Sequence, residues 1–157
     1  MAETQNVQPT PAAPAPVAYQ ASTAPVGQLK TNRSLLKIIL LGIITIGIYP
    51  LVIYSGISTD INIIAGRYDG KKTMHFCLLV FLVGPITAEI ATLVWFHKIS
   101  ERIGNELKRR GVAYTFSASD FWLWNVLGAL IVVGPFIYVH KLCTAMNKLS
   151  EHYNING

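Results

Sequence analysis

The feature that most constrains this chain is an uninterrupted apolar run in its first third. From Ile38 to Ile57 there are 20 residues without a charged side chain. At a rise of 1.5 Å per residue, a helix of this length spans about 30 Å, which is the thickness of the hydrocarbon core of a bilayer. A buried helix in a small soluble protein needs only one apolar face, whereas this run is apolar on every face. The run therefore predicts a helix in contact with lipid.

Two more segments of the same kind follow. The second extends from Thr73 to Phe96 and contains one charged residue, Glu89, and the third extends from Phe121 to Val139 without any. The composition agrees with a membrane location, because 52% of the residues are hydrophobic and only 13% are charged, against about 25% charged residues in soluble domains. The sequence therefore predicts an all-α integral membrane protein with three apolar segments, at about 35–57, 73–96 and 121–140.

Each apolar segment contains a proline with a glycine close by, and each is followed by an amphipathic stretch. A proline inside a helix removes one N–H donor and frees the carbonyl four residues earlier, so a kink is predicted at each place. Apolar residues recur every three or four positions in the stretches, which marks one apolar helical face. The units form a weak internal repeat, in which Pro50 and Asn62 are 12 residues apart and so are Pro135 and Asn147. The predicted helix breaks are Gly47 and Pro50, Gly84 and Pro85, and Gly134 and Pro135.

Residues 1–28 differ from the rest of the chain. They contain five of the eight prolines, and Glu3 is their one charged side chain. Such a segment cannot bury enough apolar surface to offset the entropy of ordering. We therefore predict a disordered tail over 1–28 and a membrane domain over 29–157.

The net charge of +5 indicates contact with anionic lipid headgroups rather than with nucleic acid, since Lys and Arg beside apolar spans lie near these headgroups. If all three segments cross, eight basic residues share the side of the N-terminus and five lie opposite. This distribution favours a multi-pass protein with a cytoplasmic N-terminus and an external C-terminus. The alternative is that the segments enter and return at their Gly/Pro breaks, which leaves every amphipathic stretch cytoplasmic and requires the broken backbone to be buried in protein.

Glu89 is the candidate functional residue within the membrane. A carboxylate inside an apolar segment is costly, and such acids often mark ion or proton paths. The structural alternative is an acid that is neutral, hydrogen-bonded to a neighbour, or directed toward the Trp95 end of the segment. Aromatic and basic residues at the segment ends are interpreted as interfacial anchors or topogenic charges. They are Trp95, His97, Lys98, Lys108, Arg109, Arg110, Tyr138, His140 and Lys141.

Motifs with a recognisable chemistry are not found in this sequence. It contains no HExxH, no paired-carboxylate set and no serine nucleophile motif. Cys77 and Cys143 lack the spacing of a zinc site and are interpreted as small buried hydrophobes. We therefore predict no catalytic residue, no metal site and no cofactor, and we expect that the protein is not an enzyme.

One string of residues points to a family. Thr45-Ile46-Gly47-Ile48-Tyr49-Pro50 is followed by an apolar stretch with aromatic residues and by Asp60-Ile61-Asn62. This order resembles the bacterial membrane family catalogued as domain of unknown function 4234, whose members repeat an apolar, T-x-G-I-Y, aromatic, D-x-N unit. The resemblance covers roughly residues 34–154, although Gly84-Pro85 and Gly134-Pro135 replace the Gly-Ile-Tyr element in the later units. It implies a protein of the bacterial cytoplasmic (inner) membrane and brings no activity with it.

Two classes of function remain open at this point. The favoured one is a non-catalytic membrane module that contacts the lipid bilayer and associates with itself or with another membrane protein through its Gly-containing faces and amphipathic stretches. Nucleic acid is not an expected partner. The alternative is a transport or proton-coupling subunit in which Glu89 lines a cavity.

Overall fold

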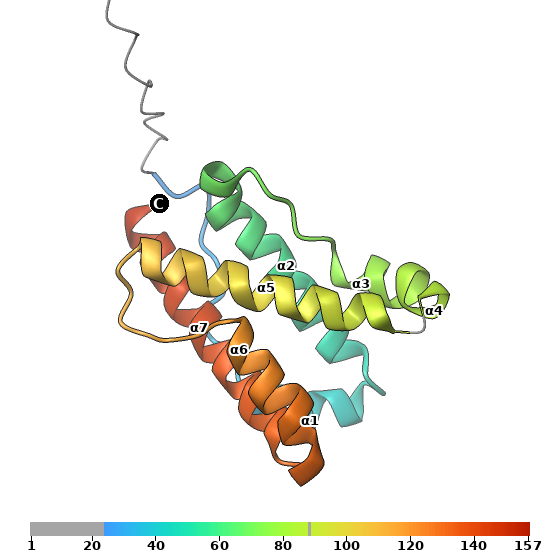
Figure 1. Cartoon of the computed structure of the whole chain (residues 1–157). Coiled ribbons are helices and arrows are strands. Elements are labelled where there is room, and N and C mark those ends of the chain that lie inside the picture. The colour runs from blue at the N-terminus through green and yellow to red at the C-terminus, as the bar shows by residue number, and fades with distance from the viewer. Residues whose placement is uncertain (1–23, 88) are drawn as a thin grey trace, which may run out of the picture.

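The structure is a computed structural model that describes residues 24–87 and 89–157. Every regular element within these residues is helical, which confirms the all-α prediction. The helices form three hairpins in succession (Figure 1). In each hairpin a short apolar arm leads through a tight turn into a helix of 20 to 23 residues.

The first hairpin joins α1 (Leu35–Ile44) to α2 (Ile48–Asp69). Its turn contains two residues with left-handed backbone, Ile46 at φ 51° and Gly47 at φ 83°. Such φ values suit glycine and strain a β-branched residue. The two left-handed residues reverse the direction of the chain, so that α1 packs against the beginning of α2.

The second hairpin has an arm of three short pieces. These are α3 (Phe76–Leu78), the π-helical η1 (Leu79–Val83) and α4 (Gly84–Ile86). The arm turns at Glu89, which has φ 65°, into the long helix α5 (Ile90–Arg109).

The third hairpin repeats this plan. Its arm consists of α6 (Ala118–Asp120), the π-helical η2 (Phe121–Val126) and the 3-10 helix η3 (Leu127–Ile131). The turn contains Val132 at φ 60°, and the long helix is α7 (Gly134–Asn156). Each of the three turns thus holds one non-glycine residue with positive φ.

The Gly/Pro breaks therefore do more than kink a helix. Beside each of them the chain reverses, so the three predicted kinked apolar helices are hairpins in the structure. Pro50 and Pro135 lie in the first turn of α2 and α7, where a helix does not use the N–H group that proline lacks. Of the described residues, one helix, α2, is long and apolar enough to cross a membrane.

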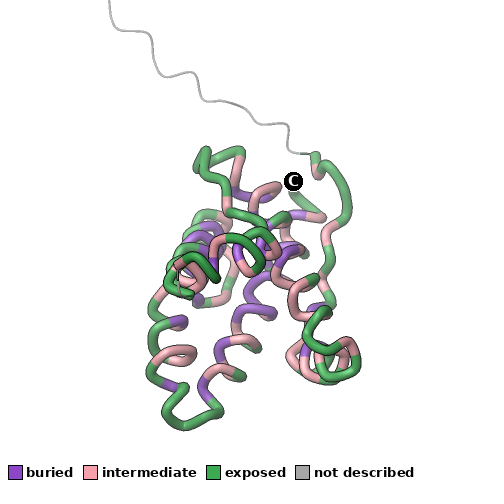
Figure 2. Tube along the Cα trace, turned by 90° about the vertical axis from the view of Figure 1, so that its right-hand side faces the viewer, coloured by how far each residue is buried: buried purple, intermediate pink, exposed green. Residues whose placement is uncertain are grey.

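The hydrophobic core lies where the C-terminal parts of α2, α5 and α7 meet. In Figure 1 these ends gather at the upper left, and the three turns lie at the right and at the bottom. Figure 2 shows the buried positions in the middle of the fold and exposed positions around it. The fully buried residues include Ile57, Ile61, Ile64, Ile99, Ile103, Leu107, Leu142, Met146 and Leu149. These are the apolar stripes of the amphipathic stretches, so the stripes pack against one another within the chain.

Phe96 is the centre of an aromatic cluster at the junction between the core and the arms. Its ring centroid lies 5.0 to 6.0 Å from those of five neighbours. Two of these neighbours, Phe76 and Phe121, come from the arms of the second and third hairpins. The cluster consists of Phe96 with Tyr54, Phe76, Trp95, Phe121 and Tyr138.

Trp95 and Tyr138, which were predicted as interfacial anchors, lie inside the protein. They are 5% and 1% exposed, because the returning arms cover them. Trp95 Nε1 donates a hydrogen bond to the Met74 carbonyl at 2.8 Å, and the Tyr138 hydroxyl is 2.8 Å from Ser100 Oγ. Their polar atoms are therefore satisfied inside the protein.

The entrance to each hairpin is held by the long helix of another hairpin. The side-chain amide of Asn62 on α2 forms two hydrogen bonds with the backbone of Thr73, at 2.7 and 2.8 Å. Asn147 on α7 forms the same pair with the backbone of Arg33, at 3.1 and 2.8 Å. These are the two asparagines that the sequence places 12 residues after a proline.

The third entrance uses close packing in place of an asparagine. A Cβ atom added to Gly104 on α5 would lie 2.2 Å from the carbonyl oxygen of Phe116. Only glycine therefore fits between α5 and the segment that leads into the third hairpin.

The boundary predicted for the tail needs a correction. Residues 1–23 lie outside the described residues, so the predicted disorder is not addressed there. Within 24–28, however, the Val26 N–H donates a hydrogen bond to the hydroxyl of Tyr153 at 3.0 Å. The chain therefore contacts the core before residue 29.

Candidate functional site

Exposed apolar side chains are concentrated around the three turns. We call the residues 40–52, 78–94 and 122–136 the hairpin ends. Of 26 exposed large apolar side chains among the described residues, 21 lie in the hairpin ends, and Ile46 is 93% exposed. The other five are Val26, Leu36, Tyr68, Met74 and Ile155.

Backbone groups at the first two turns are paired within the hairpin. Thr45 Oγ1 donates to the Leu41 carbonyl at 2.6 Å and accepts from the Tyr49 N–H at 2.9 Å. Thr87 makes the same two bonds, at 2.9 and 3.3 Å, with the carbonyl four residues before it and the N–H four residues after it. One threonine thus joins the end of the arm to the beginning of the long helix. It supplies an acceptor that the first turn of a helix otherwise lacks.

Two glycines close the third turn. A Cβ atom on Gly128 would lie 2.8 Å from Gly134 Cα, and one on Gly134 would lie 2.3 Å from the carbonyl carbon of Gly128. The arm and α7 therefore touch backbone to backbone. Within this turn the Val132 N–H donates to the Ala129 carbonyl at 3.1 Å.

Glu89 lies in the second turn rather than inside a helix. Its side chain is exposed, and its Oε2 atom accepts a hydrogen bond from Thr92 Oγ1 at 2.8 Å. Glu89 is also absent from the lining of the large groove beside α5. The structure thus places it as a residue at a hairpin end that is bonded to a neighbour, which corrects its prediction as an acid within an apolar helix.

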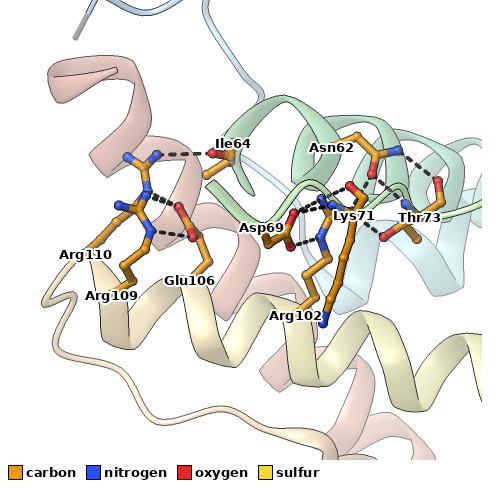
Figure 3. Close-up of polar contacts among 9 residues, drawn as sticks. All are labelled: Asn62, Ile64, Asp69, Lys71, Thr73, Arg102, Glu106, Arg109 and Arg110. Atoms are coloured by element: carbon orange, nitrogen blue, oxygen red, sulfur yellow. Dashed lines mark hydrogen bonds and ion pairs between the residues drawn. The ribbon is translucent and has the colours of Figure 1, made fainter. Parts of the chain in front are cut away.

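A buried arginine organises the polar region between α2 and α5 (Figure 3). Arg102 forms two bonds with the carboxylate of Asp69, from Nε at 2.6 Å and from Nη2 at 3.0 Å. Its Nη1 atom also donates to Asn62 Oδ1 at 2.5 Å and to Thr73 Oγ1 at 2.7 Å, and its Nη2 atom donates to the Lys71 carbonyl at 2.5 Å. The side chain is 8% exposed, and all three guanidinium nitrogens are bonded.

The pKa of the Asp69 carboxyl reflects these contacts. Burial alone would raise the pKa, since it disfavours the charged form. The hydrogen bonds from Arg102 and from the Lys71 N–H, together with the charge of Arg102, outweigh burial and hold this pKa below its ordinary value. The network therefore favours the ionised form of Asp69.

A second cluster holds the C-terminal ends of the long helices together (Figure 3). Glu106 accepts bonds from Arg109 and Arg110 at 2.5 to 2.8 Å. Arg110, with a side chain 4% exposed, also donates to the Gly157 carbonyl at 2.9 Å and to the Ile64 carbonyl at 3.5 Å. Arg109 lies over the ring of Tyr68. Arg109 and Arg110, which were predicted as topogenic charges, thus form structural contacts at the ends of the long helices.

The remaining residues predicted as anchors have mixed surroundings. His97 accepts a hydrogen bond from Trp122 Nε1 at 3.1 Å, and Lys141 forms an ion pair with Asp120. Lys98, Lys108 and His140 are exposed.

Sequence reasoning did not find the network around Arg102. The partners of Arg102 lie 33 and 40 residues away in Asp69 and Asn62. The one available signal was the Asp60-Ile61-Asn62 element of the family resemblance. In the part of the chain that the structure describes, no three His, Cys, Asp or Glu side chains are grouped so that they could hold a metal ion.

The fold and the exposed surface define a class: a small all-helical protein in which an ion-paired core carries three hairpins with apolar ends. Within that class, the family model described as Domain of unknown function (DUF4234) matches residues 33–105, which confirms the family resemblance. The match ends before the third hairpin, the region where Gly134-Pro135 replaces the Gly-Ile-Tyr element. The chain matches no curated protein and no solved structure.

Proposed function

We propose that this chain is a non-catalytic module of the bacterial cytoplasmic membrane. Its three hairpin ends enter one leaflet, and its helical core stays on the cytoplasmic surface. The observation that carries the proposal is that 21 of 26 exposed large apolar side chains lie in the hairpin ends. An exposed apolar surface of this kind, bordered by polar residues, is typical of a membrane or protein interaction site.

The length of the arms supports entry into one leaflet. The arm of the first hairpin has 10 residues, about 15 Å of helix, and the arm of the second extends over residues 76–86, about 16 Å. The hydrocarbon core is about 30 Å thick. Each of these two arms is therefore long enough to reach about the middle of the bilayer and return, which is the re-entrant topology that the sequence left open.

The backbone of the turns is suited to such an environment. An unpaired N–H or C=O group costs several kcal/mol in hydrocarbon, so irregular backbone must find partners within the protein. Thr45 and Thr87 supply side-chain partners at the first two turns. In the third turn the Val132 N–H is bonded to the Ala129 carbonyl.

The distribution of charge supports the same topology. All 13 Lys and Arg residues lie outside the hairpin ends. Under the positive-inside rule this distribution favours a core on the cytoplasmic side. The C-terminal part of α2, in turn, is unsuited to crossing the membrane, because Ile57, Ile61 and Ile64 are fully buried in the core.

We assign the module the task of holding its core at the membrane surface, where it associates with a second copy or with another membrane protein. The apolar stripes are buried in the core, so this association uses the outer faces of the helices and the hairpin ends.

A topology experiment tests the proposal. One set of fusions carries a reporter after Gly157, and a second carries an epitope in the loop at Gly111, between the second and third hairpins. We expect both on the cytoplasmic side. A crossing of all three segments would put Gly157 outside and Gly111 inside, and that result would overturn the proposal. Recovery of the chain from the soluble fraction after gentle lysis would overturn it as well.

A further inference from the structure

A groove of about 910 Å³ runs along α5 between the arm of the second hairpin and the end of α2. Toward the turn its walls are apolar and include Leu79, Val83, Ile90 and Val94. At the other end the lining is charged and contains Lys71, Lys72 and Lys98. The groove thus changes from apolar to basic along one direction.

The three lysines give the charged end a positive potential. Arg102 and Arg109 also line the groove, but Asp69 and Glu106 neutralise them at short range. The amino groups of Lys71, Lys72 and Lys98 form no ion pair within the described residues. Glu101 is the one further acid in the lining, so a net positive charge remains for an anion.

The apolar part has the depth of one leaflet. From Ile90 at the beginning of α5 to Lys98 there are eight residues, or about 12 Å of helix. Half of a hydrocarbon core measures about 15 Å. If the hairpin end reaches the middle of the bilayer, Lys98 lies near the level of the headgroups.

We propose that this groove binds a phospholipid with an anionic headgroup, taken from the surrounding leaflet. The phosphate lies between Lys71, Lys72 and Lys98, and an acyl chain lies along Val83, Ile90 and Val94. This inference rests on the proposed function, because the lipid enters from the leaflet into which the second hairpin is inserted. It assigns that hairpin a specific ligand in addition to its role as an anchor.

The first experiment uses the purified full chain in mild detergent and native mass spectrometry with phosphatidylglycerol or phosphatidylcholine. The unsubstituted protein should retain phosphatidylglycerol in preference to phosphatidylcholine. Changing Lys71, Lys72 and Lys98 together to Gln should weaken this retention roughly tenfold to a hundredfold, since each lysine near an anionic lipid contributes to binding. The matched control changes Lys30, Lys37 and Lys148 to Gln, which removes the same charge outside the groove and should leave retention unchanged.

A second pair of variants tests the apolar part. Ala91 lines the groove, whereas Leu93 on the same helix is exposed outside it. Ala91→Trp should fill the groove and reduce phosphatidylglycerol retention by tenfold or more with all lysines present, and Leu93→Trp should not. Circular dichroism and the thermal midpoint check that each variant is folded.

Several results would overturn the inference. One is equal retention of the two lipids. Another is a loss of phosphatidylglycerol retention in the control variant as large as that in the groove variant. A third is full displacement of the lipid by soluble glycerol phosphate, which would show that a free phosphate is sufficient. The failure of the proposed function is distinguishable. A crossing topology with selective lipid retention would overturn the topology alone, whereas a same-side topology without lipid preference would overturn the groove.

Discussion

The core and the hairpin ends differ in where their apolar side chains lie and in which polar groups need partners. In the core, the stripes of α2, α5 and α7 are buried, and the charged groups among them are paired, as Arg102 is with Asp69. In the hairpin ends the apolar side chains are exposed, and the polar groups that need partners are those of the backbone. Core and hairpin ends are joined by the aromatic cluster around Phe96. The difference implies that stability resides in the core and that the hairpin ends serve an environment outside the protein.

The core and the hairpin ends also differ in backbone conformation. The long helices have ordinary backbone, whereas Ile46, Glu89 and Val132 all have positive φ. Such a conformation costs about 1–3 kcal/mol for a non-glycine residue and persists where the surroundings impose it. The strain is thus confined to the turns, which supports a functional reason for reversing the chain there.

The largest expected effect separates the two regions directly. Ile103→Ala removes a fully buried side chain and should destabilise the protein by about 2–5 kcal/mol, through lost apolar contact and a cavity. Ile44→Ala, at a position 74% exposed, should change stability by less than about 0.5 kcal/mol and weaken membrane association instead. Thermal unfolding in detergent and flotation with liposomes measure the two effects. Equal destabilisation by both variants would break the comparison.

A smaller loss is expected when the arginine of the core is removed. Arg102→Met removes the hydrogen bonds that Arg102 donates to Asp69, Asn62 and Thr73. It should cost about 2–3 kcal/mol, below the roughly 3–5 kcal/mol of a fully buried pair, because the Asp69 side chain is 27% exposed. Lys98→Met, one helical turn earlier and exposed, is the control and should be nearly neutral. If the two variants unfold at the same temperature, the network does not stabilise the core.

Relief of backbone strain in a turn should stabilise the folded protein rather than destabilise it. Val132→Gly removes the penalty of a β-branched residue at φ 60° and should stabilise the folded protein by about 0.5–1 kcal/mol, after the entropy that glycine gains in the unfolded chain is counted. Val133→Gly is the control, since Val133 has φ −74° and glycine can only weaken that position. A destabilising Val132→Gly would show that packing, not backbone conformation, dominates this turn.

The smallest effect is a pH dependence from Asp69. Its pKa is lowered in the folded protein, so the carboxylate stabilises the fold above its ordinary pKa, and this contribution is lost as the pH falls through the lowered value. The thermal midpoint of the unsubstituted protein should therefore decrease more steeply between neutral and acidic pH than that of Asp69→Asn. Parallel pH profiles of the two proteins would contradict the pKa direction.

The sequence by itself determined the elements of this fold. Runs without charge mark the arms, a glycine and a proline mark each break, and the spacing of Ile57, Ile61 and Ile64 marks a helical face that must be covered. The all-helical class and the family resemblance followed from these local patterns. All of them depend on residues close together in the chain.

Tertiary structure decided the direction that the chain takes after each break and the role of the polar residues. A kinked helix and a hairpin share the same Gly/Pro signal, and the choice between them depends on whether three distant stripes can pack together. Trp95 and Tyr138 were predicted to be interfacial because local sequence cannot show that Phe76 and Phe121 return to cover them. Arg102 likewise finds Asp69 and Asn62 only after the fold brings together segments 33 and 40 residues apart. Contacts over such separations depend on closing long loops and burying shared surface, and no local period in the sequence encodes them.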